Sequence, residues 1–283
     1  MIINKLFRKK NAEETTSKAQ TDTAVNNETA EDGKKKKKRG RYGYYNKYYE
    51  NTRLVAGGSP NKVPFAVVEA YKNIRIHLMS ALNENGGKVV AFSSPNASEG
   101  KSTTAVNIAI TLSQLNKKVI IVDTDVRRAT VNKKLRIPNE KGCSDVLAGE
   151  ATIEEAVQNY SNYLDVLTSG SITNNPSELF SSTEFDRLIT DLKEIYDYVI
   201  VDTPPVNLVS DTLAIAQKCD GLILIARASV TTYAAFKSSV ATVKQLNINL
   251  LGTIINGSGA ARKKYRSYYK YSRYGYSRYG YYK

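Results

Sequence analysis

Short runs of Val, Ile and Leu recur along the middle of this chain, and two of them end directly at an aspartate. Val119–Asp123 reads VIIVD and Tyr198–Asp202 reads YVIVD. These runs lack the apolar–polar alternation of a strand with one solvated face, so both faces are expected to be buried. Strands buried on both faces occur in parallel sheets that are covered by helices. The pattern therefore predicts one doubly wound, mostly parallel α/β domain.

Helical periodicity separates these apolar runs, which predicts successive βαβ units. The predicted strands are Lys88–Ser93, Val119–Asp123, Leu164–Thr168, Tyr198–Asp202, Gly221–Ala226 and Leu250–Ile255. The predicted helices are Ser102–Leu115, Glu184–Ile195, Asp211–Gln217 and Tyr233–Leu246. A further amphipathic helix over 67–82 precedes them, with an apolar stripe of Val67, Tyr71, Ile74, Leu78, Ala81 and Leu82.

The charge of the chain belongs to its two ends. The formal net charge is +14, yet residues 54–261 hold 19 basic and 20 acidic side chains. Residues 11–40 are polar and aperiodic, and residues 262–283 hold nine tyrosines and eight basic residues without one acid. Such segments carry too little aliphatic surface to form a core. We predict a disordered basic, Tyr-containing arm (1–60), a globular domain (61–261) and a flexible Tyr-rich tail (262–283).

Several classes of protein are excluded by what the sequence lacks. No apolar run approaches the roughly 20 residues of a membrane helix, and the N-terminus has the wrong charge order for a secretory signal. The sole histidine, His77, is followed by Leu78, and Asp-Phe-Gly is absent, which excludes a eukaryotic-type kinase. Neither Cys143 nor Cys219 has an arginine six residues later, so a cysteine-dependent phosphatase loop is missing. The two cysteines offer neither the spacing of a metal site nor a disulfide framework, which is typical of a protein in a reducing cytosol.

A phosphate-binding loop is predicted where the strand Lys88–Ser93 runs into SPNASEGKST and a helix begins. Backbone N–H groups there, with the helix N-terminus, would surround the phosphates of ATP. Lys101 would reach the β and γ phosphates, and the Ser102 hydroxyl would ligate Mg²⁺. Pro95 stands where the first glycine of this motif is expected. The predicted nucleotide-contacting set is Ala97, Ser98, Glu99, Gly100, Lys101, Ser102 and Thr103.

Two further strand ends carry carboxylates. Asp123 and Asp125 follow the second apolar run, and Asp202 ends the run Tyr198–Asp202. Ligands of open α/β sheets bind at the carboxyl ends of the strands, so these side chains are expected to face the phosphates and the metal. Taken singly, either strand-end aspartate could instead be a helix cap or a turn former. Three such elements in this order favour a nucleotide site.

The three elements and the tyrosine-rich tail together resemble the bacterial tyrosine kinases (BY-kinases) of polysaccharide synthesis systems. The motifs SPNASEGKST, IIVDTDVR and VIVDTPP are similar to the Walker A, Walker A′ and Walker B motifs of that family. The segments EAYKNIRIHL (69–78) and NPSELF (175–180) also match, although Lys72 replaces the first arginine of the family's oligomerisation motif.

The resemblance implies ATP-dependent autophosphorylation of the tail in trans. Asp123 would then accept the tyrosine proton, while Ser102, Asp125 and Asp202 would hold Mg²⁺. Arg127 would stabilise charge or contact another subunit, and Asn256 would contact the adenine edge or serve as a turn residue. The implied phosphoacceptors are Tyr265, Tyr268, Tyr269, Tyr271, Tyr274, Tyr276, Tyr279, Tyr281 and Tyr282.

The resemblance also implies partners. These are a membrane-anchored activator that modulates polysaccharide chain length, a cognate tyrosine phosphatase, and further copies of the chain in a ring-like homo-oligomer built on the 67–82 helix. The kinase would be cytoplasmic and peripheral at the inner face of the membrane through the activator. Its role would be the regulation of capsule or exopolysaccharide synthesis.

Two alternatives stay open at this point. Partitioning and septum-positioning ATPases share the fold and the strand-end aspartates. Those ATPases carry a signature lysine five residues before the invariant lysine of the loop, where this chain has Asn96, and they lack a tyrosine tail. A nucleic-acid-binding module could use the Tyr, Arg and Lys side chains of the tails for backbone contact and stacking. The motifs disfavour a nucleic-acid partner, and phosphotyrosine formed with ATP and Mg²⁺ would discriminate.

Overall fold

The computed structural model describes Leu54 and residues 63–84, 86–173 and 175–258, with Glu84 described by its backbone alone. The chain divides into two units, Met1–Arg53 and Leu54–Lys283, and every described residue belongs to the second. The predicted arm, apart from Leu54, and the predicted tail with its nine phosphoacceptor tyrosines therefore lie outside the described residues.

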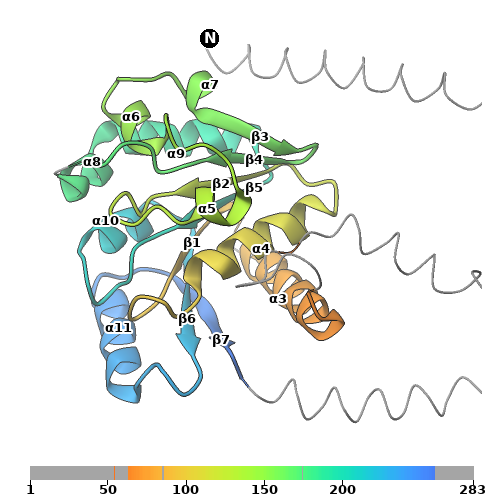
Figure 1. The fold of residues 1–283 in the computed structure, drawn as a ribbon. Coiled ribbons are helices and arrows are strands. Elements are labelled where there is room, and N and C mark those ends of the chain that lie inside the picture. The colour runs from red at the N-terminus through yellow and green to blue at the C-terminus, as the bar shows by residue number, and fades with distance from the viewer. Residues whose placement is uncertain (1–53, 55–62, 85, 174, 259–283) are drawn as a thin grey trace, which may run out of the picture. The chain divides into compact units, whose positions relative to one another are not determined.

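The second unit alternates strands and helices along most of its length (Figure 1). The strands are β1 (Val89–Ser93), β2 (Val119–Asp123), β3 (Val157–Ser161), β4 (Leu164–Leu167), β5 (Tyr198–Asp202), β6 (Gly221–Arg227) and β7 (Leu250–Asn256). The helices are α3 (Phe65–Glu84), α4 (Lys101–Ser113), α5 (Val131–Leu135), α6 (Cys143–Leu147), α7 (Ile153–Ala156), α8 (Pro176–Ser181), α9 (Thr183–Ile195), α10 (Asp211–Gln217) and α11 (Tyr233–Gln245).

All seven strands form one sheet in the order β3-β4-β2-β5-β1-β6-β7. Every neighbouring pair is parallel except β3 and β4, which are antiparallel. The prediction of a doubly wound, mostly parallel sheet is confirmed, and each predicted strand is present within a residue of its predicted ends. The strand β3 was not predicted, because its sequence VQNYS is polar and too short for a clear period.

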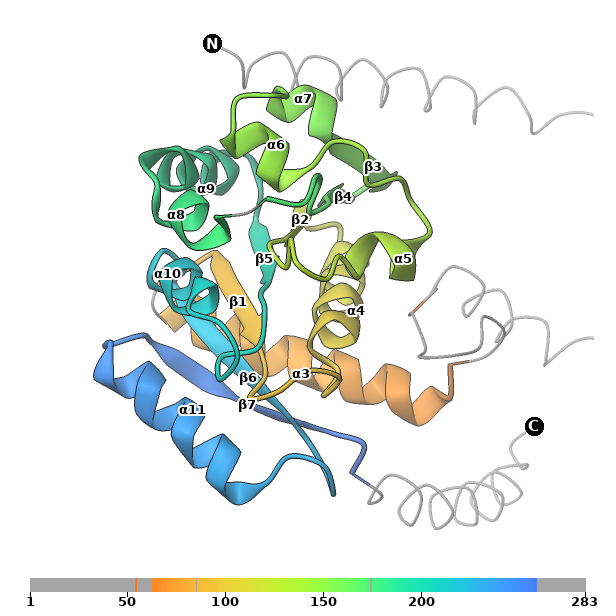
Figure 2. The same cartoon turned by 60° about the vertical axis from the view of Figure 1, so that its left-hand side comes forward.

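Helices cover both faces of this sheet (Figure 2). Alternate residues of each strand enter different clusters: Val90 and Phe92 pack with α3 and α4, while Val89 and Ala91 pack toward the helices of the other face. The strands β1, β2, β4 and β5 are buried at every position. This burial explains why their sequences lack alternation.

The long helix α3 was predicted from its apolar stripe, with one error at its beginning. Val68 is buried at the N-terminal end, whereas the predicted Val67 is exposed, because the helix turns Val68 toward the same face as Leu78 and Leu82. The guanidinium of Arg75 donates to the carbonyl oxygen of Thr111 on α4 at 2.6 Å. Among the described residues, no helix is long and apolar enough to cross a membrane.

The two edges of the sheet differ in chemistry. At one edge β3 is polar, and its pairing with β4 is interrupted by a register shift between Asn159 and Ser161. At the other edge β7 has the sequence LLGTIIN, which contains no charged residue, and the side chain of Ile255 is largely exposed.

Candidate active site

The predicted phosphate loop lies between β1 and α4, as its sequence indicates. Ser94–Gly100 connects the two elements, and α4 begins at Lys101 directly after Gly100, whose φ is +104°. Ser98 also has positive φ, at 65°. A Cβ atom placed on Gly100 would lie 2.1 Å from Nδ2 of Asn256. Glycine is therefore needed here both for its backbone conformation and for the close approach of another side chain.

The sheet register brings the strand-end carboxylates together. Asp123 of β2 is paired with Asp202 of β5, and Asp202 also lies opposite Phe92 of β1, next to the phosphate loop. The ammonium of Lys101 donates to Asp125 Oδ2 at 2.9 Å and lies 3.6 Å from Asp202 Oδ2. It also donates to the hydroxyl oxygen of Ser102 at 3.2 Å. One cation from the loop is thus held by carboxylates from two other strand ends.

Asp123 is completely buried and binds the backbone of the loop that follows it. Its carboxylate accepts hydrogen bonds from the N–H groups of Asp125 at 3.0 Å, Thr130 at 3.2 Å and Val131 at 3.1 Å. Asp125 in turn accepts from the N–H of Arg128 at 3.1 Å. The two carboxylates therefore fix the conformation of residues 125–131, which comprise most of the loop from β2 to α5 and the first residue of α5.

Asp202 differs from Asp123 in having no such backbone donors. Both of its oxygens are buried, and neither accepts a hydrogen bond of normal geometry from a described residue. Burial raises the pKa of this carboxyl, although the charge of Lys101 and the Ser102 hydroxyl oppose the shift. A buried carboxylate that accepts no hydrogen bond is costly unless a cation lies close to it, as the ammonium of Lys101 does at 3.6 Å. Asp202 is therefore suited to hold a cation.

The charges in this cluster shift one another's pKa values. Burial, and then the like charge of Asp202, raise the pKa of Asp123 to about 7, against the lowering effects of Lys101 and two backbone N–H groups. Burial lowers the pKa of Lys101, but Asp202 and Asp125 outweigh it, so that this pKa is raised overall. Lys101 is therefore a permanent cation, whereas Asp123 can exchange a proton near neutral pH.

A pH dependence of stability follows from the raised pKa of Asp123. The folded protein holds a proton on this carboxyl that the unfolded chain releases, so its free energy of unfolding should rise as the pH falls from about 8 to about 5. The slope contributed by one such group is at most about 1.4 kcal/mol per pH unit. Urea unfolding in EDTA without nucleotide, compared with Asp123→Asn, measures it. Parallel pH profiles for the two proteins would contradict the prediction.

Residues from β6, β7 and the segment after β6 hold the phosphate loop from its other side. Glu99 is completely buried: its carboxylate accepts from the N–H of Asn96 at 2.9 Å and from the hydroxyl of Thr231 at 2.7 Å. Arg227 Nη1 donates to the carbonyl oxygen of Ser98 at 2.9 Å, and Asn256 Nδ2 donates to that of Glu99 at 3.1 Å. The side chains of Glu99 and Asn256 thus position the loop in this structure.

Arg127 is not part of the Lys101 cluster. Its Nε donates to Asp211 Oδ2 at 3.0 Å, at the N-terminus of α10, and Asp211 also accepts a hydrogen bond from the hydroxyl of Ser177 on α8. Asp211 is almost completely buried, whereas the side chain of Arg127 is 46% exposed. Arg127 therefore joins the loop after β2 to α8 and α10.

The structure brings together four of the five predicted catalytic side chains: Lys101, Asp123, Asp125 and Asp202. Sequence reasoning missed Lys134 of α5, which is half-buried. Burial lowers the pKa of Lys134, and the charges of Asp202 and Lys101 are close enough to shift it further, in opposite directions. It also missed Thr231 and Asp211, because hydroxyl and carboxylate partners far apart in sequence leave no pattern. Their contacts arise only when the strands are assembled.

The residues present fit Mg²⁺ with a nucleotide. The hydroxyl of Ser102 and the carboxylates of Asp125 and Asp202 offer hard oxygen donors, and Asp202 has two oxygens that no described donor satisfies. No cluster of three or more His, Cys, Asp or Glu side chains arranged for a metal occurs in the described part of the chain. Mg²⁺ in phosphate sites usually takes only one or two carboxylates, together with phosphate oxygens and water.

Comparison with known proteins assigns the family. Residues 87–250 match the model of a family described as AAA domain. The chain is 37% identical over 205 residues to tyrosine-protein kinase YwqD of Bacillus subtilis (strain 168), a match that covers 71% of this chain and 85% of that protein. It is 30% identical over 224 residues to tyrosine-protein kinase CpsD of Streptococcus agalactiae, covering 78% of this chain and 97% of that protein.

A solved structure agrees with these relatives. The kinase domain of the Escherichia coli tyrosine kinase ETK superposes with a TM-score of 0.65 at 30% identity, covering 67% of this chain and 75% of that one. Fold, strand-end cluster and sequence relatives lead to the same assignment. The chain belongs to the family of bacterial tyrosine-protein kinases.

Proposed function

We propose that this kinase transfers the γ-phosphoryl group of ATP to tyrosines of its own C-terminal tail, Arg262–Lys283, in trans within an oligomer. The observation that supports this most is the position of Lys101, which α4 places between the carboxylates of β2 and β5 at the edge where parallel strands end. The nine tyrosines of the tail are the acceptors that the sequence offers in greatest density.

Each residue of the cluster has a role in this proposal. Lys101 leaves Asp125 to bind the β and γ phosphates, and the N–H groups from Ala97 in the loop to Thr103 in the first turn of α4 bind the remaining phosphate oxygens. Ser102, Asp125 and Asp202 would hold Mg²⁺, which when bound neutralises phosphate charge. Asp123, with its raised pKa, accepts the proton of the attacking tyrosine hydroxyl.

The remaining two residues act at a distance from the reacting atoms. Arg127, held by Asp211, supports the loop after β2 and is exposed enough to contact a second subunit. Asn256 supports the phosphate loop through the carbonyl oxygen of Glu99 and lies on the side of β1 where β6 and β7 end. From that position it would contact the adenine edge of ATP.

Partners and location complete the proposal. A membrane-anchored activator that modulates polysaccharide chain length would hold the cytoplasmic kinase at the inner face of the membrane, and a cognate phosphatase would reverse the modification. Copies of the chain would form a ring-like homo-oligomer through α3, where Ile76 is an exposed apolar side chain and Lys72 pairs with Glu69 at 2.8 Å. The regulated process would be capsule or exopolysaccharide synthesis.

A mixing experiment tests both the acceptor and the transfer in trans. One protein carries all nine tail tyrosines as phenylalanine but keeps its active site, and the other is Lys101→Met with an intact tail. With ATP and Mg²⁺, each protein alone should give no tail phosphotyrosine, whereas the mixture should phosphorylate the tail of Lys101→Met. Mass spectrometry locates the phosphate. No phosphate on that tail, while wild-type protein is phosphorylated there, would disprove transfer in trans.

A further inference from the structure

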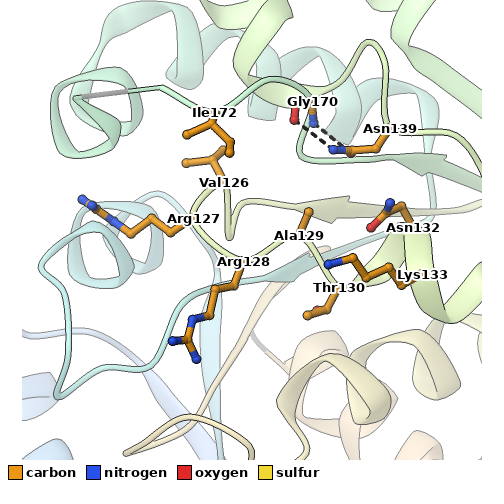
Figure 3. A pocket seen from close by; sticks show the side chains of 10 residues that line it. All are labelled: Val126, Arg127, Arg128, Ala129, Thr130, Asn132, Lys133, Asn139, Gly170 and Ile172. Carbon is orange, nitrogen blue, oxygen red and sulfur yellow. Dashed lines mark hydrogen bonds between the residues drawn. The ribbon is translucent and has the colours of Figure 1, made fainter.

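A cavity of about 480 Å³ lies beside the loop that follows β2. It is lined by Val126, Arg127, Arg128, Ala129, Thr130, Asn132, Lys133, Asn139, Gly170 and Ile172, and we call it the Arg128 pocket (Figure 3). Its volume is within the range of sites for small ligands, roughly 300–1,000 Å³. Of its lining residues, only Arg127 was among the predicted site residues.

The lining is cationic and contains no acid. Three of the ten residues are Arg or Lys. Asp211 neutralises Arg127, whose side chain is directed away from Lys133 in Figure 3. Arg128 and Lys133 are exposed and form no ion pair with any described residue. The pocket therefore presents two unpaired positive charges, which favour an anionic ligand.

The rest of the lining favours a ligand that also has an apolar part. Ile172 is 83% exposed, and Val126 and Ala129 add further apolar surface. Asn139 closes one side, because its amide exchanges two hydrogen bonds with the backbone of Gly170, at 2.9 and 3.0 Å. The hydroxyl of Thr130 forms no hydrogen bond with a described residue. A ring bearing a phosphate would match both the apolar surface and the unpaired cations.

The position of the pocket separates it from the ATP site and connects it to the transfer site. Its residues follow β2 and β4, whereas the phosphate loop accepts hydrogen bonds from the last residues of β6 and β7, strands that lie on the other side of β1. The loop that forms its wall donates hydrogen bonds to two of the three catalytic carboxylates: Arg128 N–H to Asp125, and Thr130 N–H to Asp123. A ligand in the pocket thus lies next to the place where tyrosine would be phosphorylated.

We propose that the Arg128 pocket binds a phosphotyrosine of the tail Arg262–Lys283, so that a tail which already carries one phosphate is held for the next transfer. This inference rests on the proposed function, since it takes the phosphorylated tail as the ligand. Each phosphotyrosine carries about −1.5 to −2 charges and pairs well with Arg. The unmodified tail, with eight basic residues and no acid, would instead be repelled by Arg128 and Lys133.

The spacing of the tail tyrosines suits this arrangement. Successive tyrosines from Tyr265 to Tyr282 are separated by one to three positions. In an extended peptide, at about 3.3 Å per residue, a separation of two or three positions is about 7–10 Å. A phosphotyrosine in the pocket would therefore keep the neighbouring tyrosine within reach of the transfer site, which favours repeated phosphorylation of one tail.

Peptide binding tests the pocket without requiring the kinase reaction. Two synthetic peptides of sequence 262–283 are compared, one unmodified and one with phosphotyrosine at Tyr276. The partner is the full chain with its tail tyrosines changed to phenylalanine, without ATP. We expect the phosphopeptide to bind at least tenfold more tightly by fluorescence anisotropy. Arg128→Ala with Lys133→Ala should abolish this difference, whereas the control Lys237→Ala, an exposed lysine of α11, should preserve it.

Two further arms make the outcome decisive. A phosphoserine peptide should bind more weakly than the phosphotyrosine peptide, and Ile172→Ser should remove that preference for the ring. Equal affinity of modified and unmodified peptides, or a difference that persists in the double variant, would overturn the proposal. Because the phosphate is synthetic, failure of tail phosphorylation in the mixing experiment would disprove the proposed function without affecting this result.

Discussion

Lys101→Met is expected to reduce tyrosine phosphorylation by at least about a hundredfold, because removal of a single pre-positioned group that stabilises developing charge typically costs that much. The variant also leaves Asp125 and Asp202 buried without their cation. Breaking a buried ion pair costs about 3–5 kcal/mol of folding free energy. We therefore expect the protein to remain folded but to unfold at a lower temperature. The loss should be larger at pH 8 than at pH 6, because Asp123, whose pKa is raised to about 7, is a further charge that Lys101 compensates mainly at the higher pH.

The matched control is Lys244→Met, which changes an exposed lysine of α11. Anti-phosphotyrosine detection and thermal unfolding should both leave this control at the wild-type level. Wild-type phosphorylation by Lys101→Met would exclude Lys101 from the site. An equal loss of stability at both pH values would mean that Lys101 does not compensate the charge of Asp123.

Gly100→Ala is expected to weaken nucleotide binding by about tenfold or more and to lower the free energy of unfolding by about 1–3 kcal/mol. Part of the loss is the positive φ of +104°, which non-glycine residues adopt only at a cost. The rest arises because the new methyl group would displace Asn256, whose amide lies 2.1 Å from the Cβ position and whose hydrogen bond to Glu99 would be broken. Calorimetric titration with ATP and urea unfolding measure the two effects.

Two controls separate these causes. Gly149→Ala has a similar backbone requirement, with φ of +76°, but no atom within 4 Å of the added Cβ, so it should show the conformational cost alone. Adding Asn256→Ala to Gly100→Ala removes the steric conflict and should restore part of the lost stability, whereas ATP affinity should stay low because the Asn256 amide is lost. If the double variant is no more stable than Gly100→Ala, and Gly100→Ala is no less stable than Gly149→Ala, the contact with Asn256 has no role.

Much of the fold could be predicted because the strands buried on both faces appear in the sequence as unbroken apolar runs. Val119–Asp123 and Tyr198–Asp202 are apolar at every position because both of their faces are covered. The helices α5, α6 and α7 have four or five residues each, too few to show a helical period, and were missed. Local pattern thus identified the long elements and failed where tertiary contacts alone hold a short turn.

The same division applies to the site. The carboxylates could be placed together because parallel strands end at one edge, so Asp123 and Asp202 had to be neighbours once their strands paired. The contact between Glu99 and Thr231 joins residues 132 positions apart, through loops whose course depends on the whole sheet. The sequence pattern therefore predicts which strand ends lie close together, but it does not predict that the Thr231 hydroxyl binds the buried Glu99.

The two edges of the sheet differ in how readily they could pair with a strand of another molecule, and therefore in their tendency to start aggregation. The polar strand β3, with its register shift, is a poor template for another strand. The uncharged strand β7 has no such protection in its own sequence, and it exposes Ile255 at an edge that pairs with no other described strand. Unwanted cross-β association of concentrated protein should therefore start at β7, and a single lysine at position 253, on the exposed side of that strand, would act as a gatekeeper.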